Sequence, residues 1–154
     1  MAYWLMKSEP DTYSIDDLER EVKNAWEGCR NYTVRNFFRD RFEPGDLAFF
    51  YHSNAVPSGI AGVMRVESKG YADHTQYDPK SDYYDPKAKT DPPTWLLVDV
   101  SFVRKFDRVI PLSALRENPD TAGMAVCMRG QRLSVMPVTE EEWNAVMAMV
   151  DPSK

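Results

Sequence analysis

Residues 47–66, LAFFYHSNAVPSGIAGVMRV, decide the fold. Residues 47–53 are almost all apolar or aromatic, which predicts a buried strand. Residues 59–66 predict a second strand directly after a short loop. The glycines of this second strand, Gly59 and Gly62, indicate a bulge or a close approach of another backbone.

The elements around this strand pair define the class of fold. Strands are predicted over 3–6, 94–106 and 131–138, and a long surface loop over 67–93. Helices are predicted over 15–26 and 33–41, with a helical turn over 112–117 and a last helix after Thr139. Capping-box spacings at Ser14 and Thr139 support two of these helix starts. Helices near the ends and strands in the middle predict an α+β fold with a mixed or antiparallel β-barrel.

Length and composition exclude several classes of protein. With 154 residues, 43% of them hydrophobic and 28% charged, the chain is expected to form one globular domain over 1–154. No apolar run approaches the ~18 residues of a membrane span, and the N-terminus does not have the pattern of a signal peptide. Only two cysteines are present. A reduced, cytoplasmic protein fits this count best, with a single Cys29–Cys127 disulfide as the alternative.

Motifs typical of enzymes are missing from the sequence. It holds no nucleophile elbow, P-loop, dinucleotide fingerprint or zinc-protease motif. His74 lies in the polar loop with one nearby acid, too few ligands for a metal site, and we expect neither a metal nor a cofactor. His52 ends an aromatic strand and is the best candidate for a general base, but no group that would orient it is evident.

Polar and aromatic residues are dense where four predicted elements end. The segments are 7–10, 26–36, 49–53 and 129–134. If these ends meet at one mouth of a barrel, aromatic rings there offer stacking surfaces, amides and hydroxyls read base edges, and basic groups hold phosphates. The aromatic side chains fit a hydrophobic core as well, and Asn31 is equally suited to cap the second helix.

The chain resembles the EVE domain family over nearly its whole length. The resemblance rests on Lys7-Ser8-Glu9-Pro10, Trp26-x-Gly28-x-Arg30-Asn31-Tyr32-x-x-Arg35-Asn36, Phe50-Tyr51-His52-Ser53, Gly59-Ile60-x-Gly62 and Gly130-Gln131-Arg132-Leu133-Ser134. It is strongest to stand-alone bacterial members. The order and spacing of five segments are more specific than any single motif.

The resemblance implies a PUA-like β-barrel with flanking helices and a non-enzymatic module that reads a modified base. The expected partner is DNA, or RNA, that carries a methylated or oxidised cytosine. By this analogy the base pocket is formed by Trp26, Asn31, Tyr32, Tyr51, His52 and Ser53. The rim or phosphate surface is formed by Lys7, Ser8, Glu9, Arg30, Arg35, Gln131, Arg132 and Ser134. Cys29 stands where members more often have a small aliphatic residue.

The formal net charge of −5 argues against a protein that wraps a duplex through many phosphate contacts. Charge is nevertheless segregated, because residues 20–42 hold six basic and three acidic groups whereas residues 67–99 hold four and seven. A small pocket with a locally positive rim remains compatible with this distribution. Two rival functions stay open: a nucleotide-modifying enzyme that uses His52, and an adaptor whose exposed aromatics bind a partner protein.

Overall fold

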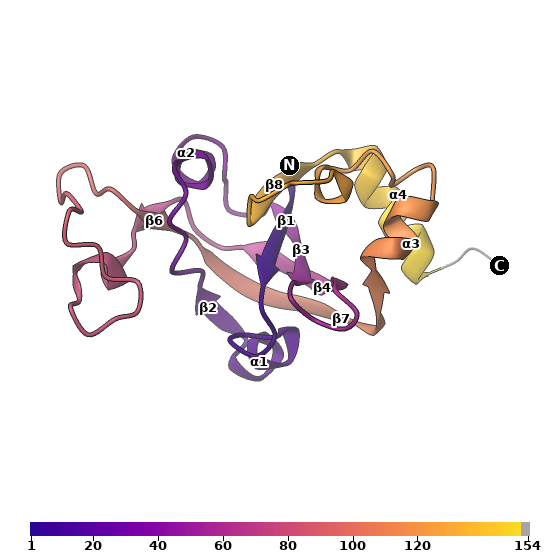
Figure 1. The fold of residues 1–154 in the computed structure, drawn as a ribbon, viewed down its shortest axis with the longest axis horizontal. Helices are drawn as coiled ribbons and strands as arrows, with labels where there is room; N and C mark the ends of the chain where they lie inside the picture. The colour runs from indigo at the N-terminus through magenta and orange to yellow at the C-terminus, as the bar shows by residue number, and fades with distance from the viewer. Residues whose placement is uncertain (152–154) are drawn as a thin grey trace.

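A curled sheet of six strands forms the centre of the molecule. The structure, a computed structural model, describes residues 1–151 (Figure 1). The strands are β1 (Tyr3–Ser8), β2 (Lys23–Ala25), β3 (Leu47–His52), β4 (Gly59–Val66), β7 (Asp99–Pro111) and β8 (Val135–Val138), in the spatial order β2-β7-β4-β3-β1-β8. β1 pairs with β3 in parallel, and every other pair in this sheet is antiparallel. The predicted α+β class with a mixed sheet is therefore confirmed, the sheet curling into a half-barrel.

Helices flank the sheet and cover one end of the molecule (Figure 1). They are α1 (Ile15–Glu21), α2 (Tyr32–Asp40), α3 (Leu112–Glu117) and α4 (Glu140–Val150). α3 and α4 lie together at one end of the long axis, and the segment between β5 (Tyr71–Ala72) and β6 (Leu96–Leu97) projects at the other (Figure 1). This segment contains a short 3-10 helix, η1 (His74–Tyr77). A second 3-10 helix, η2 (Ala125–Cys127), precedes β8. None of the helices in residues 1–151 is long and apolar enough to cross a membrane.

The close backbone approaches predicted at the β4 glycines are present. A Cβ atom on Gly59 would lie 2.0 Å from the Ile110 carbonyl oxygen, and one on Gly62 would lie 2.3 Å from that of Arg104. The β4–β7 register also shifts between Ile60 and Gly62. Glycine at these two positions therefore lets the strands pair closely where the sheet bends.

The helix predicted over 15–26 is too long. α1 ends at Glu21, because Val22 adopts a left-handed backbone conformation with φ of 71°. Lys23–Ala25 then pair with β7 as strand β2. Val22 and Trp26 have the spacing of a helix, but pairing with the long strand β7 determines the structure here. Local periodicity cannot predict such a tertiary contact.

Smaller differences concern element limits. α2 covers Tyr32–Asp40 and begins one residue earlier than predicted, whereas the strand predicted over 131–138 is reduced to β8. The strand predicted over 94–106 divides into β6 and β7, and β7 continues to Pro111. Both predicted capping boxes are present, at the starts of α1 and α4. Cys29 and Cys127 are both free thiols.

Two hydrophobic cores lie on opposite faces of the sheet. Phe50 belongs to the core beneath α1 and α2, which also holds Trp4 and Trp26. Its neighbours Phe49 and Tyr51 point to the other face and pack in the core around α3 and α4. This alternation follows from the two-residue period of a strand, and it determines which side chains of β3 reach each side of the molecule.

Candidate functional site

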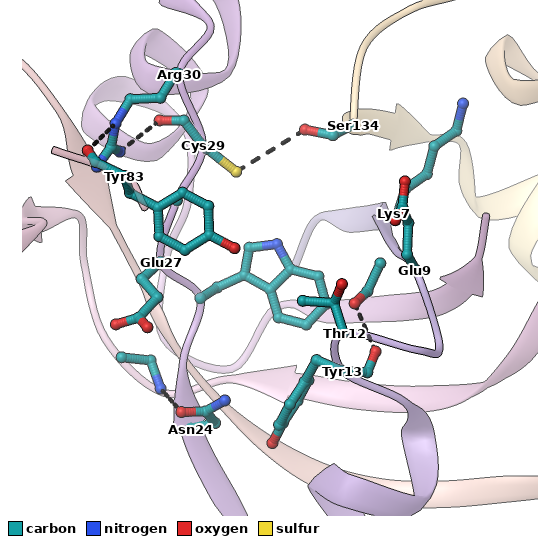
Figure 2. A pocket seen from close by; sticks show the side chains of 14 residues that line it. Lys7, Glu9, Thr12, Tyr13, Asn24, Glu27, Cys29, Arg30, Tyr83 and Ser134 are labelled. Carbon is teal, nitrogen blue, oxygen red and sulfur yellow. Dashed lines mark hydrogen bonds between the residues drawn. The ribbon is translucent and has the colours of Figure 1, made fainter. Parts of the chain in front are cut away.

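A pocket of about 430 Å³ opens beside the first strand and the segment that follows β2. Three segments line it, 7–9, 12–13 and 24–30, together with Tyr83 and Ser134 (Figure 2). Its volume lies in the range of about 300–1,000 Å³ that is usual for small-ligand sites.

Trp26 is the tryptophan among the residues that line the pocket. Trp26 follows the last residue of β2, and its N–H donates to the Val98 carbonyl at 2.8 Å, which continues the β2–β7 pairing by one residue. Its ring packs edge-on against Phe50, with centroids 5.4 Å apart, and the side chain is buried. Phe50 therefore supports the ring from the core side, and Trp26 forms part of the pocket lining.

Asp73 ties the wall of the pocket to the projecting segment. This fully buried carboxylate accepts hydrogen bonds from the Gly28 N–H at 2.8 Å and from Arg30 Nη1 at 3.0 Å. It also accepts from the N–H and the hydroxyl of Thr75. Burial alone would raise the pKa of Asp73, but these donors outweigh it and hold the pKa below the usual value. Asp73 thus stays ionised and fixes segment 28–30.

Tyr83 forms a pocket wall that the sequence did not reveal. Arg30 donates through Nε and Nη2 to the Tyr83 carbonyl, at 3.1 and 2.7 Å. Gly28 has a φ of +91°, and a Cβ atom there would lie 2.7 Å from the Tyr83 ring. Glycine at this position allows both the left-handed backbone and the close contact with the ring. Tyr83 therefore holds the loop to the body of the protein at the pocket.

Other lining residues were not anticipated either. Tyr13 and Asn24 lie on the opposite side of the pocket from Cys29 (Figure 2). The Tyr13 hydroxyl is buried without a hydrogen-bond partner among the described residues, and burial is the main cause that raises its pKa to about 12. The sequence feature that could have pointed to Tyr13 is its position directly before Ser14, the residue that caps α1. This position keeps Tyr13 next to the start of the helix.

The Cys29 thiol points into the pocket and lies 3.9 Å from the Ser134 hydroxyl (Figure 2). Burial raises the pKa of this thiol to about 11. The group is therefore protonated at neutral pH and is a weakly polar part of the wall. It has the character of a small hydrophobic side chain, not of a nucleophile.

The structure brings six of the predicted residues together around one pocket. They are Trp26 from the predicted base site, and Lys7, Ser8, Glu9, Arg30 and Ser134 from the predicted rim. Lys7 and Ser8 end β1, and the Lys7 N–H donates to the Ser134 carbonyl at 2.7 Å, which joins two segments far apart in the sequence.

The β3 residues predicted for the pocket lie elsewhere. Tyr51 packs in the core on the opposite face. His52 Nε2 accepts the Ile15 N–H at the start of α1, at 3.1 Å. Burial, the largest cause, lowers the pKa of His52, which favours the neutral ring that this acceptor role requires. The Ser53 N–H donates to the Ser8 carbonyl at 3.0 Å. Alternation along β3 therefore removes Tyr51 from the pocket and leaves His52 as a support of α1.

The residues around the start of α2 also lie outside the pocket. Asn31 caps the helix, because its Oδ1 accepts the Val34 N–H at 3.1 Å. Tyr32 is 60% exposed and stacks on Trp95. Arg35 donates through Nη1 to the Thr94 carbonyl at 3.0 Å. These side chains form a separate surface next to the pocket wall.

The remaining predicted rim residues belong to the turn before β8. Gln131 Oε1 accepts the Leu133 N–H at 3.0 Å, so this side chain stabilises its own turn. Arg132 is exposed and does not line the pocket. Ser134, two residues further on, is the part of this segment that reaches the pocket.

Comparison with known proteins identifies the family. A model of the EVE domain family matches residues 2–149. Human thymocyte nuclear protein 1 is 42% identical over 166 residues, which cover 96% of this chain and 73% of the human protein. A crystal structure from Pseudomonas syringae has 46% identity and a TM-score of 0.92, and it covers 96% of this chain and 99% of that one. The crystal structure of human THYN1 in complex with DNA that contains 5-methylcytosine has 39% identity, a TM-score of 0.91 and 100% coverage of both chains. This chain therefore belongs to the EVE domain family.

Proposed function

We propose that this protein is a non-enzymatic DNA-binding module that takes a modified cytosine, extruded from its strand, into the pocket around Trp26. The observation that carries the proposal is the Trp26 ring, fixed against Phe50 and surrounded by polar groups in an open pocket. Human THYN1, crystallised with 5-methylcytosine DNA, has the same fold over the whole of the crystallised chain.

The energetics favour a base in this pocket. Extruding a base costs a few kcal/mol. Stacking on an aromatic ring returns about 1–3 kcal/mol per base, and hydrogen bonds to the base edge supply the remainder. Asn24, Ser134 and the backbone of segment 24–30 offer donors and acceptors around the ring. Binding therefore depends on both the ring and its polar border.

The charges of the pocket suit a neutral ligand group. Its lining contains two basic residues, Lys7 and Arg30, and two acidic residues, Glu9 and Glu27. Arg30 is already paired with the buried Asp73. A phosphate at the centre of the pocket would meet nearly balanced charge, whereas an uncharged base would not require a counterion.

The arrangement around His52 does not favour the enzymatic alternative. Its Nε2 is used by the Ile15 N–H, and the residue is not part of the pocket lining. A general base must reach the proton that it removes, at about 2.6–3.2 Å or through one water. We therefore assign His52 a role in holding α1 and not in chemistry.

The test is direct binding of matched oligonucleotides. Single-stranded and duplex DNA with one central cytosine, 5-methylcytosine or 5-hydroxymethylcytosine, and the RNA equivalents, are titrated by fluorescence anisotropy at two salt concentrations. We expect tighter binding of a modified DNA than of its unmodified counterpart. Equal affinity for all of them refutes the proposal. Mass spectrometry of the recovered oligonucleotide is expected to show no chemical change, and a product would favour an enzyme.

Two variants link the binding to the pocket. Trp26→Ala removes the stacking ring and is expected to abolish the preference for the modified base. Trp26→Phe keeps a smaller ring and much of the packing against Phe50, so it is expected to retain part of the preference. Melting temperatures show whether each variant is folded. A folded Trp26→Ala protein with unchanged preference would place the site elsewhere.

A further inference from the structure

An exposed aromatic surface lies next to the pocket wall and has no part in the pocket itself. Tyr32, the first residue of α2, is 60% exposed. Its ring stacks on Trp95, with centroids 4.8 Å apart and planes 29° from parallel. The Arg35 guanidinium lies 5.0 Å from the centre of the Tyr32 ring. We call Tyr32, Trp95 and Arg35 the α2 platform.

The α2 platform is continuous with the pocket through Arg30. Arg30 lines the pocket, and its guanidinium lies 5.7 Å from the centre of the Trp95 ring. Arg30 and Tyr32 are two residues apart, so their Cα atoms lie within about 7 Å of each other. A strand with one nucleotide in the pocket therefore has a neighbouring nucleotide within reach of Tyr32.

The platform is held in place before any ligand binds. Trp95 Nε1 donates to Asp85 at 2.7 Å, and the Trp95 N–H donates to Gln76 Oε1 at 2.8 Å. Arg35 donates to the Thr94 carbonyl through Nη1, and its Nη2 makes no hydrogen bond to any residue of 1–151. An aromatic ring of fixed orientation loses little freedom on binding, which favours stacking. The Nη2 group is therefore available as a donor to an anion such as phosphate.

The chemistry of the platform fits a nucleic-acid strand. An exposed ring next to a guanidinium matches the alternation of base and phosphate along a single strand. The surrounding helix is basic as well, since α2 contains Arg35 and Arg39 and a single acid, Asp40.

We propose that the α2 platform binds the nucleotide adjacent to the one in the pocket, with its base on Tyr32 and its phosphate at Arg35. This inference rests on the proposed function, because it takes the pocket to hold a nucleotide of the same strand. It assigns to Tyr32 a role distinct from that of Trp26. Tyr32 would strengthen binding of a strand without selecting the modification.

The experiment compares ligands that do and do not reach the platform. The ligands are 5-methyl-2′-deoxycytidine alone, a single-stranded heptanucleotide with a central 5-methylcytosine, its unmethylated counterpart, and two methylated heptanucleotides with an abasic site directly 5′ or 3′ of the central base. Affinities are measured for the wild-type protein and for Tyr32→Ala. Tyr32→Phe retains the ring, and Tyr84→Ala removes another exposed tyrosine, from the projecting segment, as a matched control.

We expect Tyr32→Ala to weaken binding of the intact heptanucleotide by about 5- to 150-fold, the range for loss of one stacked base. Binding of the nucleoside is expected to change less than twofold. One of the abasic ligands should weaken wild-type binding to the level of Tyr32→Ala and cause no further loss in that variant. Tyr32→Phe and Tyr84→Ala should behave as wild type.

Two results for the Tyr32→Ala variant overturn the inference. One is an unchanged affinity of Tyr32→Ala for the intact heptanucleotide. The other is an equal loss for nucleoside and heptanucleotide, which would mean that Tyr32 acts by positioning the pocket. A heptanucleotide bound without preference for methylation refutes the proposed function, yet the abasic comparison still decides the platform. A wild-type protein that binds no heptanucleotide refutes both proposals.

Discussion

Replacement of Asp73 by asparagine is the most informative perturbation of this site. Asp73 is the buried group on which the pocket wall depends, because Gly28 and Arg30 both donate to it. Asparagine has nearly the same shape, retains one acceptor oxygen and removes the charge. The variant therefore tests the hydrogen-bonded ion pair with little change in packing volume.

The expected loss of stability follows from the burial of the pair. Breaking a buried ion pair costs about 3–5 kcal/mol. The Arg30 side chain is 22% exposed, so water solvates part of its charge and the lower end applies, about 3 kcal/mol. For a domain of this size 1 kcal/mol lowers the melting temperature by about 2–4 °C, so Asp73→Asn should melt about 6–12 °C below wild type.

The pH dependence identifies the charge as the cause. The pKa of Asp73 is lowered in the folded protein, against about 3.9 for an unfolded aspartate. Its contribution to stability is therefore complete above about pH 3.9 and is lost as the pH falls through the lower folded value. Asparagine does not titrate, so the difference between wild type and variant should shrink below about pH 4.

Urea unfolding at pH 7 and at several acidic values, followed by tryptophan fluorescence, measures both effects. Asp82→Asn, an exposed aspartate on the same segment, is the control and should change stability by less than about 0.5 kcal/mol. A loss below about 1 kcal/mol for Asp73→Asn at pH 7, or a difference that does not depend on pH, would refute the assigned role of the carboxylate.

Three further predictions concern residues around the pocket. Gly28→Ala should destabilise the fold by about 2 kcal/mol or more, since it combines a left-handed alanine with displacement of the Tyr83 ring. Gly130 also has a positive φ but has open space around it, so Gly130→Ala should destabilise the fold less than Gly28→Ala. Thermal melts of the two variants measure the difference. Tyr13→Phe removes a buried hydroxyl without a partner and should leave stability unchanged or raise it by about 1 kcal/mol in urea unfolding. Cys29, with a thiol pKa of about 11, should react with a disulfide reagent at pH 7 far more slowly than a free cysteine.

Local sequence patterns predict the helix starts well. The Ser14–Asp17 and Thr139–Glu142 pairs form the expected capping boxes, because each depends only on residues three positions apart. The end of α1 is different. Lys23–Ala25 gain a strand partner in β7, about 75 residues further along the chain, and no local pattern contains that information.

In the site, too, local patterns were predictable and contacts between distant segments were not. Trp26 and the 7–9 segment were identified because they lie in dense polar and aromatic stretches. Asp73 and Tyr83 were not, because their importance arises only where a distant loop meets Gly28 and Arg30. Gly28 gave one hint, since a glycine in a loop is compatible with a close approach by another part of the chain.

The net charge of −5 includes carboxylates that are buried in the interior of the protein. Asp46 is buried and accepts hydrogen bonds from the Ala2 N–H and from Trp4 Nε1, at 3.0 and 3.1 Å. Asp73 is buried and paired with Arg30. These carboxylates organise the interior, whereas Arg35 lies beside the exposed Tyr32 ring with an Nη2 group that makes no hydrogen bond within residues 1–151. Because the charges that shape the pocket differ from those next to its mouth, an acidic chain and a nucleic-acid ligand are physically compatible.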